Sequence, residues 1–121
     1  PRGLAPTGWH VPSNTEWSTL IDFLGGDPSV VGGAMRETGN THWSDHNEGA
    51  TNSSGFSGLP GGFRNTSGVF NFIGRSAGWF SSTERNETNV WVCGLEFDTG
   101  DVYITNSASK IWGRSVRCIR D

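Results

Sequence analysis

Residues 8–17 read GWHVPSNTEW, and this stretch carries the clearest structural signal in the sequence. Ser13 and Glu16 have the spacing of a capping box, in which the Ser13 side chain accepts from the Glu16 N–H and the Glu16 carboxylate accepts from the Ser13 N–H. Apolar residues then recur at the spacing of one helix face: Trp17, Leu20, Ile21 and Leu24. Two glycines follow, which end a helix without a Cβ clash. We therefore predict a helix over residues 14–24.

The composition narrows the class of protein. A chain of 121 residues fits one domain, here residues 1–121, and 18 glycines with only 17% charged residues indicate many turns rather than a helical bundle. The formal net charge is −3 and Lys110 is the single lysine, which argues against a nucleic-acid partner. No run of about 18 apolar residues is present, so we expect no membrane insertion by this domain. Because the sequence begins at Pro1, we expect it to be a piece of a longer polypeptide.

The remainder of the chain divides into a short helix, a long irregular region and strands. Asp27 as N-cap and Pro28 in the first turn predict a second helix over residues 29–36. Two internal glycines weaken this helix, and we expect it to pack on the first helix. Residues 37–64 are polar and glycine-rich and show no period. The predicted strands are residues 69–73, 79–82, 88–97, 102–105 and 115–119.

The order of these elements predicts an α+β domain, with two N-terminal helices, a long irregular loop region and a C-terminal antiparallel sheet. In the central strand, alternation places four residues on the predicted core face: Trp91, Cys93, Leu95 and Phe97. The opposite face carries Val90, Val92, Gly94 and Glu96. We also predict that five of the six tryptophans belong to the core: Trp9, Trp17, Trp43, Trp79 and Trp91.

Ordered motifs along nearly the whole chain carry a family resemblance. They are Gly8 to Ser13 with Glu16-Trp17, Glu37-Thr38-Gly39 with His42-Trp43, Gly49 to Asn52, Ser54-Gly55-Phe56, Leu59 to Gly62, Trp79 with Ser81 to Glu84, and Ser115 to Cys118. The sequence resembles the Fibrobacter succinogenes major paralogous domain. The resemblance implies a C-type-lectin-like fold, distantly similar to formylglycine-generating, sulfatase-modifying proteins. It also implies a bacterial cell-surface or secreted setting, often as one module of a larger protein or lipoprotein, with no established activity.

The two cysteines leave two interpretations open. Cys93 and Cys118 both lie in strand-like segments, where neighbouring strands can bring two Cα atoms within bonding distance, so they form either a disulfide or two buried thiols. Members of the family usually have a cysteine before Pro-Thr-Gly-Trp, where this chain has Ala5. A bridge between Cys93 and Cys118 would restore a lost pairing. Neither cysteine lies in a reactive turn, which argues against a cysteine-dependent oxidase.

One polar loop contains candidate metal ligands. Lectin-like folds often hold calcium with loop oxygens, and this loop offers Asp45, Asn47, Glu48 and Asn52. We therefore consider a structural calcium ion and expect no other cofactor. His42 and His46 crowd the same loop, but the segment shows no helical pattern that would place them together on zinc, and a structural role for His42 is the preferred interpretation.

The candidate ligand contacts lie on the closing loops of the sheet, over residues 84–89 and 105–113, and on the exposed side of the last hairpin. They combine amides, cations and aromatic rings: Arg85, Asn86, Asn89, Tyr103, Asn106, Lys110 and Trp112. We expect a non-enzymatic extracellular binding or adhesion module for a glycan or a protein surface. The alternatives are an enzyme of the formylglycine-generating type or another enzyme, such as a hydrolase, and a structural module of a surface fibre. The oligomeric state stays open.

Overall fold

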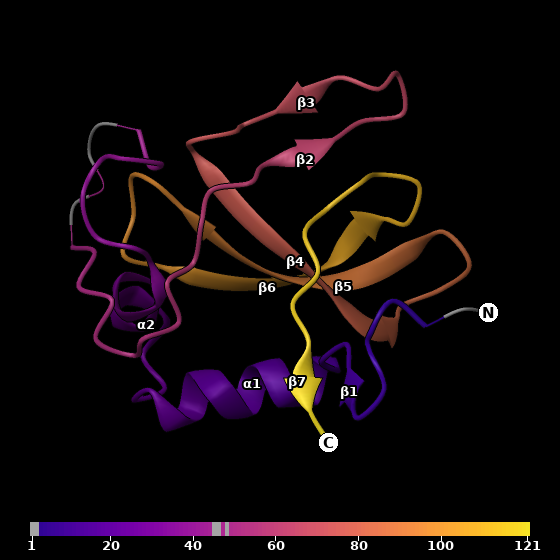
Figure 1. The fold of residues 1–121 in the computed structure, drawn as a ribbon, viewed down its shortest axis with the longest axis horizontal. Coiled ribbons are helices and arrows are strands. Elements are labelled where there is room, and N and C mark those ends of the chain that lie inside the picture. The colour runs from indigo at the N-terminus through magenta and orange to yellow at the C-terminus, as the bar shows by residue number, and fades with distance from the viewer. Residues whose placement is uncertain (1–2, 45–46, 48) are drawn as a thin grey trace.

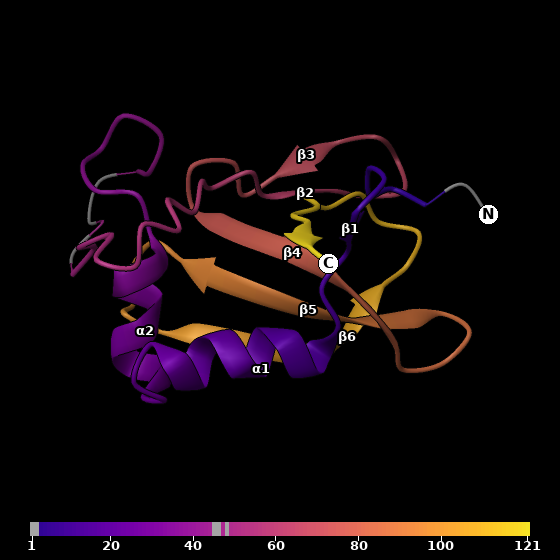
Figure 2. The same cartoon turned by 60° about the horizontal axis from the view of Figure 1, so that its bottom comes forward.

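The computed structural model describes residues 3–44, 47 and 49–121 and shows an α+β fold (Figure 1). Its elements in chain order are β1 (Trp9–His10), α1 (Asn14–Phe23), α2 (Pro28–Met35), β2 (Phe63–Arg64), β3 (Phe70–Asn71), β4 (Ser76–Glu84), β5 (Asn89–Glu96), β6 (Val102–Ser109) and β7 (Ile119–Arg120). Figures 1 and 2 show α1 along one side of the β4–β5–β6 sheet and the β2–β3 hairpin on the other. No described helix is long and apolar enough to cross a membrane.

Helix α1 confirms the prediction from the opening stretch. The Glu16 N–H donates to Ser13 Oγ at 3.3 Å, and the Ser13 N–H donates to Glu16 Oε2 at 2.8 Å. The helix ends at Phe23 with Leu24 as its C-cap. Gly25 follows with a φ of 118°, a conformation that favours glycine. The capping box therefore fixes where the helix begins, and Trp17 and Ile21 on its apolar face are buried in the core.

Helix α2 begins as predicted, because the Asp27 side chain accepts from the Ser29 N–H at 3.0 Å. It packs mainly against β6 and the turn before it, so the prediction that it packs on the first helix was wrong. The reason lies in its glycines. A Cβ on Gly32 would stand 2.3 Å from the Gly100 carbonyl oxygen, and the Gly33 N–H donates to the same oxygen at 3.1 Å. These glycines permit close contact with the β5–β6 turn.

The antiparallel sheet β4–β5–β6 confirms the prediction of a C-terminal sheet and extends two of its strands. Two other predicted strands were too long. Residues 69–73 contribute only β3, and residues 115–119 contribute an isolated parallel bridge from Ser115 to Trp79 before β7 begins at Ile119. Strand β7 pairs with β1 instead of joining the sheet, so the last strand of the chain lies beside the first (Figure 1).

The main core lies between the helices and the sheet. Its buried members are Trp17, Ile21, Val31, Met35, Trp43, Ala77, Trp79, Cys93, Leu95 and Val102, with Phe97 partly buried beside them. A second cluster on the opposite face joins Val90, Val92 and Ala108 to Phe80. Both faces of the central strand are thus covered, whereas the sequence pattern predicted one.

Two predicted core tryptophans lie elsewhere. Trp91 is half-buried and belongs to neither core cluster, because the register of β5 against β6 shifts between Val90 and Val92 and interrupts the regular pairing at this residue. Trp9 is 45% exposed because its strand is two residues long and pairs only with β7. The predictions for Trp17, Trp43 and Trp79 are confirmed.

His10 links the two ends of the chain. Its Nδ1 lies 2.6 Å from Asp121 Oδ1 and its Nε2 lies 2.8 Å from Glu16 Oε1. Hydrogen bonds to Glu16 and then Asp121 raise the pKa of His10, while the pKa of Glu16 falls to about 2 because of its bonds to Ser13 and His10. Glu16 therefore stays ionised across the range in which His10 titrates.

We expect the His10 contacts to stabilise the domain more in mild acid than in base. A raised histidine pKa contributes stability that is fully present below the unfolded value, about 6.5, and is lost as the pH rises through the folded value. The gap in melting temperature between the wild type and His10→Gln should therefore shrink from about pH 5.5 to about pH 9. Asp121→Asn should show a smaller dependence of the same sign. A gap that is constant with pH would contradict this role.

Candidate functional site

The β2–β3 hairpin projects from the sheet on the side away from α1 (Figure 2). Its turn is held by Asn65, whose Oδ1 accepts from the Ser67 N–H and the Val69 N–H, each at 3.0 Å. Strand β2 is also bridged to Gly113, so the loop after β6 lies against the hairpin. These contacts fix the hairpin by backbone pairing and turn chemistry rather than by burial of its side chains.

The hairpin exposes a run of large apolar side chains. Val69 is 53% exposed, Phe70 62%, Phe72 57% and Ile73 62%. Phe72 also adopts a φ of 58°, which is rare for a bulky residue and costs backbone energy. We call these four residues, together with the rings of Phe63 and Trp112, the hairpin patch. Large exposed apolar side chains, where they gather on a surface, mark interaction sites in soluble proteins.

Stacked rings form the base of the hairpin patch. The Phe63 ring stacks on Trp112, with centroids 4.8 Å apart and planes 8° apart, and on Phe72, with centroids 5.7 Å apart. The Arg114 guanidinium lies over Phe63 at 5.1 Å. Trp112 is consequently half-buried, with one ring face against its neighbour. Of the predicted ligand residues, Trp112 is the one that this patch contains.

Tyr103 lies elsewhere, on the same face of the sheet as Glu96 and Ser76. It pairs with Gly94, where a Cβ would stand 2.2 Å from the tyrosine ring, so the glycine makes room for that ring. Ser76 Oγ donates to Glu96 Oε1 at 3.0 Å. Burial is the largest cause of the raised pKa of Glu96 and of the raised pKa of Tyr103. Tyr103 is therefore a half-buried side chain of the sheet and is not part of a loop.

The other predicted ligand residues lie around the β4–β5 turn, after the end of β6 and, for Asn106, within β6. Asn86 Oδ1 accepts from the Thr88 N–H and the Asn89 N–H, and Asn89 Nδ2 donates to the Ser107 carbonyl oxygen, so both amides support local structure. Lys110 Nζ lies 3.0 Å from Glu84 Oε1. Arg85 is exposed and Asn106 half-buried. The structure thus separates the predicted residues into a turn, the tyrosine cluster and the hairpin patch.

The predicted calcium ligands Asp45 and Glu48 lie outside the described residues, as does His46, which was considered for zinc. Asn47 Nδ2 donates to the carbonyl oxygens of Glu37 and Gly39. Both amide atoms of Asn52 bond Ser57. Within residues 3–44, 47 and 49–121, no three histidine, cysteine or carboxylate side chains cluster as metal ligands. His42 bonds Glu37 at 2.8 Å.

The two cysteines are free thiols. Cys93 lies on β5, whereas the segment before Cys118 runs along the far edge of β4, where Ser115 bridges Trp79. One strand therefore separates them, and strands spaced about 4.8 Å apart place such residues beyond the Cα distance of about 7 Å that a disulfide tolerates. Burial raises the pKa of Cys93 to about 12, so this thiol is a poor nucleophile.

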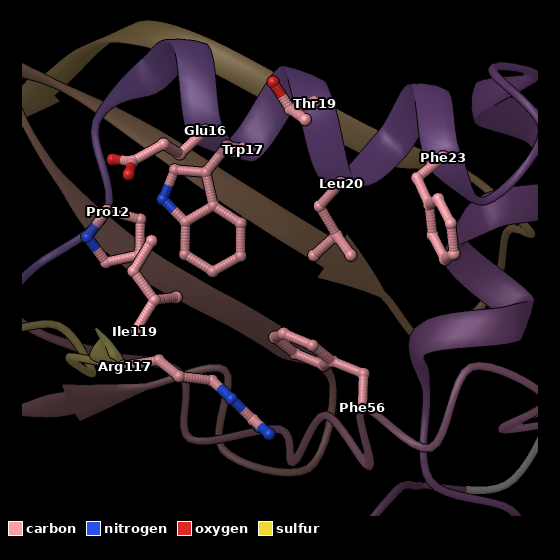
Figure 3. A pocket seen from close by; sticks show the side chains of 9 residues that line it. All are labelled: Pro12, Glu16, Trp17, Thr19, Leu20, Phe23, Phe56, Arg117 and Ile119. Carbon is pink, nitrogen blue, oxygen red and sulfur yellow. The ribbon is translucent and has the colours of Figure 1, made fainter. Parts of the chain in front are cut away.

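A separate apolar pocket lies beside α1 (Figure 3). Its volume is about 380 Å³, and its lining comprises Pro12, Glu16, Trp17, Thr19, Leu20, Phe23, Phe56, Arg117 and Ile119. Figure 3 shows Trp17, Leu20 and Phe23 projecting from the helix toward Phe56, with the Arg117 side chain along the opposite wall. We call this cavity the α1 pocket.

Sequence reasoning missed both the hairpin patch and the α1 pocket. The sequence predicts a strand over residues 69–73, and apolar side chains in a strand do not by themselves indicate exposure. The signal that was available is the run of four apolar residues among five, next to glycine-rich turns. The α1 pocket depends on the approach of Phe56 and Arg117 to the helix, which no local pattern encodes.

Comparison with known proteins places the chain in a family. The model of the Fibrobacter succinogenes major domain matches residues 1–120. Searches of curated proteins and of solved structures found no significant match. The match covers nearly the full length and agrees with the motifs that extend from Gly8 to Cys118. This chain therefore belongs to the Fibrobacter succinogenes major domain family.

Proposed function

We propose that this domain is a non-catalytic binding module whose hairpin patch contacts a protein surface. One observation carries the proposal: four of the five residues from Val69 to Ile73 are large, apolar and more than half exposed. Their burial against a partner would contribute about 25 cal/mol for each Å² removed from water. The strained φ of Phe72 supports a functional reason for presenting these side chains.

The chemistry of the hairpin patch favours a protein over a glycan. Sugars need several hydrogen-bonding side chains around an aromatic face, but the two asparagines on this hairpin bond its own backbone. Asn65 holds the turn, and Asn71 Nδ2 donates to the Val69 carbonyl oxygen at 3.1 Å. Aromatic side chains and arginine are also the types enriched in protein interfaces, and Arg114 lies over the Phe63 ring.

The proposal does not include catalysis. The formylglycine-generating alternative needs two neighbouring reactive cysteines, whereas Cys93 is fully buried with a pKa of about 12 and lies one strand away from the edge that precedes Cys118.

A lectin-like scaffold is part of our proposal, supported by the two helices before the sheet and by the pairing of the first strand, β1, with the last, β7. An extracellular or bacterial cell-surface setting belongs to it as well, and calcium in the 45–52 loop stays a prediction.

The test is binding of the labelled domain to bacterial envelope material. Phe70→Ser with Phe72→Ser should lower the affinity at least about tenfold, because two anchor side chains are lost. Val30→Ser removes an apolar side chain that is 63% exposed on α2 and is the matched control, with unchanged binding. Circular dichroism should show that both variants remain folded.

Treatment of the envelope material separates the classes of partner. Protease digestion should abolish binding, whereas periodate oxidation of sugars should leave it unchanged. Loss of binding on periodate treatment alone would mean a glycan partner and would overturn the proposal. Self-association in solution that the hairpin variants dissolve would instead support the structural-module alternative. Equal binding by the wild type and the hairpin variants would show that the hairpin patch is not the contact surface.

A further inference from the structure

The α1 pocket lies on the side of the sheet away from the hairpin patch, so its occupant would not compete with the proposed protein contact. Its walls are mostly carbon: Trp17 and Phe56 meet edge to face with ring centroids 6.1 Å apart, and Leu20 and Ile119 lie beside them (Figure 3). A volume of about 380 Å³ falls within the range of small-molecule sites. These features suit a compact apolar body such as one aromatic ring.

Arg117 gives the α1 pocket its polarity. Among the described residues that line the pocket it is the one cationic side chain, and its guanidinium lies 3.9 Å from the Phe56 ring centroid. Within the part of the chain that the structure describes, Arg117 has neither an ion pair with a carboxylate nor a side-chain hydrogen bond. Arg117 is exposed, so its charge is open to a ligand from solvent, and the part of it that is buried lowers its pKa. An anion beside it would gain a charge-assisted hydrogen bond.

Glu16 sets the direction in which a ligand would lie. This carboxylate accepts from the Ser13 N–H and Ser13 Oγ and contacts His10, so its hydrogen-bonding capacity is largely used inside the protein. It stays negative because its pKa is about 2. Figure 3 shows the Glu16 carboxylate at one end of the pocket and the Arg117 guanidinium pointing toward Phe56 at the other. A bound anion therefore finds its hydrogen-bond donor at the second end, because the Glu16 carboxylate at the first end offers none.

We propose that the α1 pocket binds a small aromatic carboxylate. The carboxylate accepts from the Arg117 guanidinium, and the ring lies between Trp17, Leu20 and Phe56. Arg117 provides selectivity for the acid over an uncharged molecule of the same shape, and the apolar walls provide the remainder of the affinity. This site is independent of the hairpin patch and adds a ligand-binding role to the same domain.

The test compares 3-phenylpropionate with 3-phenylpropanamide, which has the same shape and no charge, by isothermal titration calorimetry. The wild-type domain should bind the acid about tenfold more tightly than the amide, the typical gain from one charged hydrogen bond. Arg117→Gln should remove this preference while leaving amide binding unchanged. Arg120→Gln, three residues further along the same segment, is the matched control and should keep the preference. Leu20→Trp should fill the pocket and abolish binding of both probes.

Chemical-shift mapping on the wild-type domain supplies a readout that does not depend on any variant. Titration with 3-phenylpropionate should shift the Trp17 indole N–H signal and the backbone amides of Leu20 and Phe56. Shifts confined to other surfaces would overturn the proposal. So would equal affinity for the acid and the amide, or the absence of binding by both probes at millimolar concentration.

Discussion

Trp79→Ala should lower the free energy of unfolding by about 3–5 kcal/mol, the cost of deleting a large buried aromatic side chain. Trp79 is 5% exposed in the middle of β4. Its ring centroid lies 5.2 Å from that of Phe56 and 6.1 Å from that of Trp17, so it joins the sheet to both α1 and the irregular region. The backbone of the same residue also bridges Ser115. One substitution therefore weakens contacts among several parts of the chain.

Urea unfolding followed by circular dichroism measures this loss, with the slope of the unfolding free energy against urea as a check on two-state behaviour. Trp9→Ala is the matched control, because Trp9 is 45% exposed, and it should cost under about 1 kcal/mol. If Trp79→Ala does not fold, Trp79→Phe should still fold with an intermediate loss. Equal losses for the two alanine variants would contradict the described core.

Gly32→Ala should destabilise the domain by about 1–3 kcal/mol, as overpacking does. Helix propensity alone predicts the opposite sign, since alanine in a helix is favoured over glycine by about 1 kcal/mol. The contact decides the outcome. A Cβ on Gly32 would stand 2.3 Å from the Gly100 carbonyl oxygen and 2.4 Å from the Asp101 carbonyl carbon, and backbone atoms in a turn cannot move aside cheaply.

Thermal unfolding of the Gly32→Ala variant gives the sign directly. Val30→Ala, on an exposed position of the same helix, serves as the control and should change stability by less than about 0.5 kcal/mol. A rise in melting temperature for Gly32→Ala would mean that α2 does not pack against the β5–β6 turn as described.

Local signals in the sequence predict the structure well where the interactions are local. The capping box of Ser13 and Glu16 fixes the start of α1, and Asp27 fixes the start of α2, because both motifs are complete within three residues. Alternation identified Cys93 and Leu95 as core residues. The same alternation failed at Trp91, where the shift in register depends on how β6 pairs with β5.

Long-range contacts account for the remaining errors. The glycines of α2 suggested a weak helix, but their role depends on a turn that comes some 70 residues later in the chain. The predicted ligand residues were grouped from two loops and the last hairpin, whereas their positions relative to one another depend on the sheet. Tyr103 consequently packs over Gly94, and Trp112 stacks on Phe63. The hairpin patch was missed because exposure of an apolar strand is a property of the whole fold.

The most direct test of the hairpin patch as the contact surface compares two double variants for binding to the same envelope material. One is Phe70→Ser with Phe72→Ser in the hairpin patch, and the other is Arg85→Ala with Lys110→Ala around the β4–β5 turn. Surface plasmon resonance measures both dissociation constants. We expect at least about a tenfold weaker affinity for the hairpin variant and an unchanged affinity for the turn variant. Weaker binding by the turn variant with unchanged binding by the hairpin variant would contradict the proposal and would indicate that the contact surface lies on the closing loops of the sheet.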